Sequence, residues 1–481
     1  MKKSILIVTL GLFVLVAIVL FRTFSFTAPQ LSNALPLVEL KSDGKLLSQA
    51  ITYETISHKS EMRNDSVFVA FHNFLQDSFP KLHKELSREV VNEHSLLYTW
   101  KGSDPSKKPL VLTGHMDVVP VDYASRNDWD ASPFSGEILD GNIYGRGAID
   151  DKGSLIAIME SIENLISQGF EPSRTLILAF GHDEEIGGDE GAKEMSRILE
   201  ERGTEAWMVI DEGGTLATGI VPGIDGTVAL IGTSEKGYVS LEVSADMGGG
   251  HSSMPEPMNA LEAVNRAIYK LKENPLPDRF SEPILGFVDY IGPHLPFVQK
   301  MAFANTWLFK PIIFNTYKKS ASGSALVHTT QVVTMFNSGL KDNVVPTRAR
   351  AVVNYRLLPG DSPEVILGRA KDLINDTVVK VTIYDDFEVS ASPISDHSSS
   401  EFEFLAQAIQ AVNPEVIISP YLVLGATDGR YYYNITDKVF RFSPIPLKKD
   451  DLSRIHGVNE RVLITGYAKS VSFYGTLIKN S

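Results

Sequence analysis

Strand and helix signals alternate along residues 96–210, and this alternation constrains the fold more than any other feature of the sequence. The predicted elements are strands at Leu96–Trp100, Leu110–Thr113, Thr175–Phe180 and Ala206–Ile210, and helices at 154–168 and 189–202. Strands that alternate with helices usually form a parallel sheet covered on both faces. We therefore predict a doubly wound α/β domain. Residues 46–92 have a helical pattern of apolar side chains and are predicted to precede the first strand.

Acidic and histidine side chains follow these predicted strands in turn. They are His115, Asp117, Asp150, Glu184, Glu185, Asp211 and, much later in the chain, His456. Each of them alone is typical of a solvated loop. Together they lie directly after apolar strands or in glycine-flanked loops, where ligands gather in open α/β sheets. The sequence contains no cysteine, so a metal site must use His, Asp and Glu.

Length and charge limit the class of protein. A chain of 481 residues is too long for one compact core, so we expect two domains. The hydrophobic content of 43% and the charged content of 22% are ordinary for a folded protein. A net charge of −14 without a basic cluster argues against nucleic acid as a partner.

The N-terminus carries an apolar run from Ile5 to Phe21, preceded by Lys2 and Lys3 and followed by Arg22. Its length is short for a membrane-spanning helix and long for the apolar part of a signal peptide. We favour an uncleaved signal anchor over a cleaved signal peptide, because no convincing cleavage site follows. The lysines place the N-terminus in the cytoplasm, so the body lies on the extracytoplasmic side, or is secreted if the segment is cleaved.

Seven motifs, taken in this order, resemble the two-zinc aminoacylase and carboxypeptidase superfamily of metallopeptidases. They are HMDVVP, GRGAIDDKG, GHDEEIGG, IDEGG, GGGHSSMP, NYRLLPG and IHGVNE. The resemblance covers roughly residues 45–481 and is strongest to the branch of carboxypeptidase S and the N-fatty-acyl-amino-acid hydrolase/synthase. It implies a small-molecule substrate with an amide bond, such as an N-acyl amino acid or a short peptide with a free carboxylate.

The resemblance also implies two zinc ions and a role for each residue of the cluster. His115 and Asp211 would complete one zinc site, Glu185 and His456 the other, and Asp150 would bridge both. Asp117 would hold His115 in one tautomer, as carboxylates next to metal ligands do. Glu184 would be the general base that takes a proton from the attacking water. In this family the Asp150–Asp151 peptide bond is expected to be cis.

The resemblance further implies an α+β lid domain inserted in the catalytic domain. The expected organisation is an anchor or signal segment at 1–26, a tether at 27–45, the catalytic domain at 46–233 and 361–481, and the lid at 234–360. Within the lid, His251 would stabilise the oxyanion, in relatives often across a dimer interface, so a homodimer through the lid is a candidate assembly. The expected substrate contacts are Arg356, Asn343, Gly425 and Thr427, with Arg356 binding the substrate carboxylate as a bidentate fork.

Two other functions compete with the zinc hydrolase. The chain could be a catalytically inert, membrane-anchored binding ectodomain, but no expected metal ligand or base is missing. It could also be a zinc aminopeptidase, which we expect to lack an inserted lid.

Residues 283–314 are unusually apolar for an exposed loop, with one acid and two lysines among many aromatic and aliphatic side chains. A patch of this size usually marks an interaction surface. One interpretation is a buried lid core or a dimer seam. The other is an apolar wall beside the active site that holds a long acyl chain.

Overall fold

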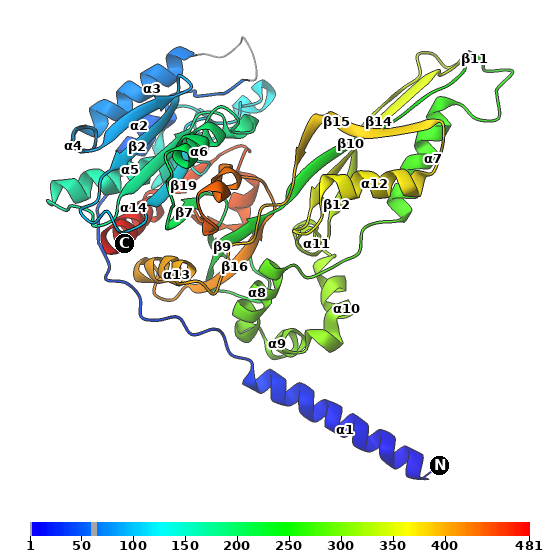
Figure 1. Cartoon of the computed structure of the whole chain (residues 1–481), viewed down its shortest axis with the longest axis horizontal. Helices are drawn as coiled ribbons and strands as arrows, with labels where there is room; N and C mark the ends of the chain where they lie inside the picture. The colour runs from blue at the N-terminus through cyan, green and yellow to red at the C-terminus, as the bar shows by residue number, and fades with distance from the viewer. Residues whose placement is uncertain (1, 59–64) are drawn as a thin grey trace.

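A mixed ten-stranded sheet forms the centre of the catalytic domain (Figure 1). The structure is a computed structural model that describes residues 2–58 and 65–481. The strands run in the order β1-β2-β6-β3-β7-β17-β9-β8-β18, and β16 pairs with β9 off this path. Their bounds are β1 (Ser87–Val91), β2 (Ser95–Trp100), β3 (Leu110–His115), β6 (Leu176–Gly181), β7 (Met208–Asp211), β8 (Thr215–Thr218), β9 (Thr227–Glu235), β16 (Ile417–Val423), β17 (Val439–Arg441) and β18 (Pro446–Lys448).

The middle of this sheet is parallel. β3 pairs in parallel with β6 and β7, and β7 pairs in parallel with β17. Every residue of β3, β6 and β7 is buried, as expected for strands covered by helices on both faces. The predicted α/β fold is confirmed. The helices of this domain are α2 (Lys45–Ile51), α3 (Asp65–Ser78), α4 (Pro80–Glu85), α5 (Lys152–Ser167), α6 (Ala192–Glu201), α13 (Ser400–Val412) and α14 (Ile464–Asn480), and a small sheet contains β4 (Ile138–Leu139), β5 (Asn142–Tyr144) and β19 (Arg461–Leu463).

The helical prediction for residues 46–92 is wrong at its C-terminal end. The last of the three helices in this region, α4, ends at Glu85, and Ser87–Val91 forms strand β1. β1 pairs antiparallel with β2, which places Val91 in the core. Pairing with the neighbouring strand therefore outweighs the local helical pattern.

The lid is a four-stranded sheet in the order β12-β14-β10-β15, with two helices packed against it. Its elements are β10 (Gly237–Asp246), α7 (Ala260–Glu273), β12 (Thr330–Ser338), β14 (Arg348–Leu357), α12 (Pro363–Ile374) and β15 (Val379–Val389), and at its tip β11 (Gly250–His251) pairs with β13 (Val344–Val345). The predicted lid boundary at residue 360 is wrong. β15 pairs antiparallel with β10, so the lid extends to Val389.

Four helices are inserted between the lid elements, and the first of them packs against strand β16 of the catalytic sheet instead of the lid sheet (Figure 1). They are α8 (Glu282–Ile291), α9 (Phe297–Ala304), α10 (Thr306–Tyr317) and α11 (Ala321–Val327). Phe287, Ile291 and Leu295 form one buried cluster with Val228 and Leu230 of β9. The apolar segment 283–314 is thus not the core of the lid.

Helix α1 (Lys2–Ser25) extends away from the body of the molecule (Figure 1). Among the described residues it is the one helix long and apolar enough to cross a membrane. The segment between α1 and α2 is extended and follows the catalytic domain. The amides of Val38 and Leu40 donate to Thr476 Oγ1 (3.0 Å) and Ser472 Oγ (3.1 Å) of α14. The predicted tether is therefore fixed to the surface of the domain.

Candidate metal centre and active site

His115 is the last residue of β3, and its side chain is held by the loop that follows. Its Nδ1 lies 2.9 Å from the Asp117 carbonyl oxygen and 3.3 Å from Asp117 Oδ1. Because both neighbours are acceptors, Nδ1 carries the proton and Nε2 is left to bind a metal. The Asp117 carboxylate also accepts the amides of Glu184 (3.2 Å) and Glu185 (3.1 Å). It thereby ties the loops after β3 and β6 together.

Asp150 lies between the two histidines. Its Oδ1 is 3.0 Å from His115 Nε2, and its Oδ2 is 3.0 Å from His456 Nε2. Glu185 Oε1 lies 3.2 Å from the same His456 nitrogen. One carboxylate that offers one oxygen to each side is the arrangement of a bridging metal ligand. The expected cis bond between Asp150 and Asp151 is present.

The loop that carries Asp150 is held by Glu460, a residue that sequence reasoning missed. The buried Glu460 Oε1 accepts the amides of Gly147 (3.0 Å) and Ile149 (2.9 Å). Its Oε2 pairs with the buried Arg146 at 2.5 Å. The glutamate of IHGVNE thus connects the His456 loop to the Asp150 loop, and its place in the same motif as His456 was the available signal.

The prediction that Asp211 binds a metal is not supported by its position. Asp211 Oδ1 accepts from Thr113 Oγ1, and its Oδ2 accepts the amide of Gly429, both at 2.5 Å. The next residue, Glu212, points into the site instead, with Oε1 3.5 Å from His115 Nε2. Asp211 ends β7, and successive side chains of a strand point to opposite sides. Glu212 therefore replaces Asp211 in the candidate ligand set.

The donor set suits divalent cations. Two groups of donors each have ligand atoms within 4.8 Å of one another: His115 with Glu184 and Glu212, and His115 with Asp150 and Glu185. Imidazole nitrogen and carboxylate oxygen are the ligands of zinc sites that lack cysteine. So many acids in one buried place need compensating positive charge.

The buried carboxylates of this cluster also shift one another's pKa values. Burial raises the pKa of the Glu184 carboxyl well above its usual range, and the neighbouring Glu212 carboxylate adds to the shift. Burial likewise raises the pKa of Glu212, and the Asp150 carboxylate adds to it. Hydrogen bonds to Asp150 and Glu185 raise the pKa of His456 to about 10.

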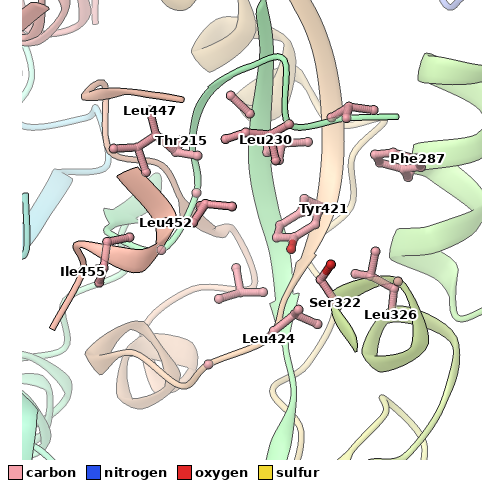
Figure 2. A pocket seen from close by; sticks show the side chains of 18 of the residues that line it. Thr215, Leu230, Phe287, Ser322, Leu326, Tyr421, Leu424, Leu447, Leu452 and Ile455 are labelled. Carbon is pink, nitrogen blue, oxygen red and sulfur yellow. The ribbon is translucent and has the colours of Figure 1, made fainter. Parts of the chain in front are cut away.

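A large apolar cavity of about 1240 Å³ opens beside this cluster. Asp150, Glu184, Glu185, Glu212 and His456 line one part of it. The rest is lined by side chains of the catalytic sheet and of the inserted helices, among them Leu230, Phe287, Leu326 and Tyr421 (Figure 2). Phe303 of the apolar segment lines the cavity, whereas Trp307 is not among the lining residues and is 55% exposed.

Arg356 and Gly425 also line the cavity, as their predicted roles require. The Arg356 guanidinium lies over the Tyr238 ring, 4.8 Å from its centroid, and forms no ion pair within the described part of the chain. Burial lowers the pKa of Arg356. Thr427 lines the cavity too, but its amide and its hydroxyl both donate to Glu235 Oε2 at 3.0 Å. Its backbone amide is thus engaged inside the protein.

His251 and Asn343 are not brought to the site by this chain. Both are exposed and lie together at the tip of the lid, where the Ser252 amide donates to the Asn343 carbonyl at 3.2 Å. The tip, where β11 pairs with β13, is the end of the lid farthest from the catalytic sheet (Figure 1).

Comparison with known proteins agrees with this geometry. Residues 111–480 match the model of peptidase family M20/M25/M40. The chain belongs to peptidase family M20. It is 40% identical over 440 residues to "Probable carboxypeptidase S-like 2" of Dictyostelium discoideum, covering 90% of this chain and 84% of that protein. It is 36% identical over 438 residues to the "N-fatty-acyl-amino acid synthase/hydrolase PM20D1" of Bos taurus, covering 90% and 86%.

Solved M20 structures share the fold of this chain. An M20 family metallo-carboxypeptidase from Sulfolobus solfataricus has a TM-score of 0.66 at 20% identity and covers 92% of this chain and 99% of its own. The expectation that aminopeptidases lack the inserted lid is wrong. Aminopeptidase PepT from Bacillus cereus covers 91% of this chain and 98% of its own, with a TM-score of 0.60 at 16% identity.

Membership of the family makes this M20 peptidase a metal-dependent hydrolase, so the interpretation as an inert binding ectodomain is set aside. Two residues near the site escaped the sequence interpretation besides Glu460. Glu212 is adjacent to Asp211, and alternation along the strand was the signal that could have separated them. Tyr238 is the second residue of the alternating strand β10, and only its pairing with Arg356 across β10 and β14 reveals its place.

Proposed function

We propose that this M20 peptidase binds two zinc ions and hydrolyses, or in reverse forms, the amide bond of N-fatty-acyl amino acids. The observation that carries the proposal is the apolar cavity, which joins the acidic cluster to a wall of aliphatic and aromatic side chains. The similarity to the Bos taurus N-fatty-acyl-amino acid synthase/hydrolase supports the same substrate class.

In this proposal His115, Asp150 and Glu212 hold one zinc, and Asp150, Glu185 and His456 hold the other. The chemistry that two bound zinc ions supply is a water of lowered pKa and a polarised amide carbonyl. Asp117 fixes the tautomer and the orientation of His115.

Glu184 acts as general base and then as general acid. It takes a proton from the water as the water oxygen attacks the amide carbon. It returns the proton to the amine nitrogen as the carbon–nitrogen bond breaks, leaving a free fatty acid and an amino acid.

The substrate carboxylate is placed at Arg356, since this guanidinium lines the cavity without an ion-pair partner among the described residues. Gly425 stays in the proposal as a backbone contact. Thr427 instead helps to position that loop through Glu235. His251 and Asn343 would come from the lid of a second copy.

The N-terminal helix is proposed to be an uncleaved anchor with the catalytic domain on the extracytoplasmic side. Lys2 and Lys3 precede the apolar run and Arg22 follows it, which favours a cytoplasmic N-terminus. The hydrogen bonds between α1 and the inserted helices support retention of the helix in the mature protein.

The test compares acetyl-, octanoyl- and oleoyl-phenylalanine as substrates. Each methylene buried in the cavity contributes about 0.8 kcal/mol, so kcat/KM should rise by up to about fourfold per methylene until the cavity is filled. Phe303→Ala and Phe287→Ala should reduce this preference, because both side chains line the cavity. Tyr269→Ala, an exposed aromatic on the lid helix α7, is the matched control. A kcat/KM that does not depend on chain length would contradict the fatty-acyl proposal and favour a short-peptide carboxypeptidase.

A further inference from the structure

The inserted helices hold the anchor helix in place. Arg22 Nε donates to the Ala304 carbonyl at 3.1 Å. Asn305 Nδ2 donates to the Val19 carbonyl (3.2 Å) and to Thr23 Oγ1 (3.3 Å). The preceding part of α1 is exposed and almost entirely apolar, so α9 lies where the anchor would leave the bilayer.

The same helices expose large apolar side chains, which we call the α9–α10 face. It consists of Phe297 (50% exposed), Val298 (70%), Trp307 (55%), Leu308 (38%) and Ile312 (58%). Phe297 lies next to Phe24 of α1, with ring centroids 5.9 Å apart. The face therefore continues the apolar surface of the anchor.

The charge around this face is also unusual for the chain. Residues 290–327 contain Lys300, Lys310, Lys318 and Lys319 and no aspartate or glutamate, in a chain with a net charge of −14. Lys318 pairs with Asp278 at 2.6 Å and Lys310 lies over the Phe280 and Phe314 rings, which leaves Lys300 and Lys319 for lipid phosphates. Apolar and aromatic side chains flanked by lysines are typical of protein surfaces that lie in the headgroup region of a bilayer. Lysines there can reach the phosphates while their stems stay in the apolar layer.

The cavity reaches this face. Val298 and Ile312 belong to the α9–α10 face and also line the cavity, together with Phe303 and Ile313 from the same two helices. At its other end the cavity is lined by Glu184 and His456 of the metal centre. One cavity is thus lined both by residues of the α9–α10 face and by residues of the metal centre.

We propose that the α9–α10 face is seated in the phospholipid bilayer that holds α1, and that the acyl chain of the substrate enters the cavity directly from the lipid. This inference rests on the proposed function for the identity of the substrate. The seating of the face rests on the proposed retention of α1 as an anchor and not on the chemistry of the substrate, and it predicts that a lipid-dissolved substrate need not pass through water.

The first measurement tests the seating without any substrate. The full chain, with α1 confirmed by mass spectrometry, is reconstituted in phosphatidylcholine vesicles with or without brominated acyl chains, which quench tryptophan at short range. Of the four tryptophans, Trp100 and Trp129 are buried and Trp207 is partly buried against Phe404, whereas Trp307 is on the face. Wild-type emission should fall in brominated vesicles, and Trp307→Phe should lose most of that quenching. If quenching is the same with and without Trp307, or if Trp307 emission depends on protein concentration instead of lipid, the face does not lie in the bilayer and the proposal is wrong.

The second measurement tests entry from the lipid. Trp307→Glu combined with Leu308→Glu changes the face but none of the residues that line the cavity. The double variant should hydrolyse dissolved octanoyl-phenylalanine within about twofold of wild type, while the rate on oleoyl-phenylalanine held in vesicles should fall at least about tenfold. Tyr269→Glu on the lid is the control for added charge. Equal loss on both substrates, or no loss on either, would overturn lipid entry. If the wild-type enzyme cleaves neither substrate, the proposed function fails, and the quenching result still decides the seating.

Discussion

At the scale of single residues, the site depends on adjacent acids that point in different directions. Glu184 and Glu185 both have their amides held by Asp117, yet Glu185 contacts His456 whereas Glu184 groups with His115 and Glu212. Asp211 and Glu212 divide in the same way, with Asp211 engaged by Thr113 and Gly429. The two members of each pair thus contact different groups, and the proton-transfer role of Glu184 belongs to the proposed function.

Three substitutions, each of which removes one negative charge, separate these roles. Glu212→Gln should reduce the bound zinc from two ions to one, because it replaces a carboxylate oxygen that would bind the metal with an uncharged amide group. Asp211→Asn should keep both ions, since its hydrogen-bond partners lie inside the protein. Glu184→Gln should also keep both ions but lower kcat by about 10²–10⁴-fold, the usual contribution of a general base. Metal content is measured by mass spectrometry of the purified proteins. Loss of zinc from Asp211→Asn with full retention in Glu212→Gln would restore the original ligand prediction.

At the scale of elements, the junction between the two domains is built around a buried ion pair. Glu235 ends β9 and Arg441 ends β17, and both are almost completely buried, with Arg441 Nε 2.9 Å from Glu235 Oε2. The same oxygen accepts the amide and hydroxyl of Thr427. The chain passes from β9 into the lid strand β10 directly after Glu235. The Glu235 carboxylate at the domain junction is therefore bound both to Arg441 of the central sheet and to Thr427 of the loop that lines the cavity.

Removing this carboxylate should destabilise the catalytic domain. Glu235→Ala leaves the Arg441 guanidinium buried without its counter-charge, so we expect a loss of about 3–5 kcal/mol in the free energy of unfolding. Glu89→Ala breaks an exposed pair with Arg202 and should cost at most about 1 kcal/mol. Urea unfolding followed by fluorescence measures both. A loss for Glu235→Ala no larger than that of the surface control would show that the pair contributes little to stability.

At the scale of the whole molecule, the tip and the edge of the lid are left without a partner within the described chain. β12 is the edge strand of the lid sheet, and four of its apolar side chains are exposed: Val332, Val333, Met335 and Phe336. An exposed apolar edge strand readily pairs with a second chain. A homodimer through this edge would cover it, and it offers a route by which His251 and Asn343 could reach the site of a partner chain.

Complementation between two inactive variants tests this assembly. His251→Ala should lower kcat by about 10²–10³-fold if the imidazole binds the developing oxyanion. Co-expression of His251→Ala with Glu184→Gln should restore roughly a quarter of wild-type activity, since half of the dimers then contain one intact composite site. Activity no higher than the sum of the two variants alone would mean that each chain works with its own lid.

The sequence by itself determined the α/β class, the family and most of the acidic cluster. Apolar runs that end at His115 or a few residues before Glu185 identify the sheet edge, because side-chain period and strand ends are local properties. The motifs do not depend on how distant segments pack. Local pattern also predicted four of the ten strands of the central sheet within a few residues, namely β2, β3, β6 and β7. It missed β1, whose formation depends on pairing with β2.

Only the tertiary structure decided the remaining points. The choice between Asp211 and Glu212 depends on Thr113 and Gly429, which lie far from them in sequence. The lid boundary depends on β15 filling the free edge of β10. The composition of the apolar segment 283–314 suits a lid core, a dimer interface or an apolar wall of the active site, because composition alone does not determine which residues a segment packs against. Its contacts with β9, the cavity and α1 join segments that are distant in sequence, by 282 residues for Arg22 and Ala304, and such contacts exist only once the chain has folded.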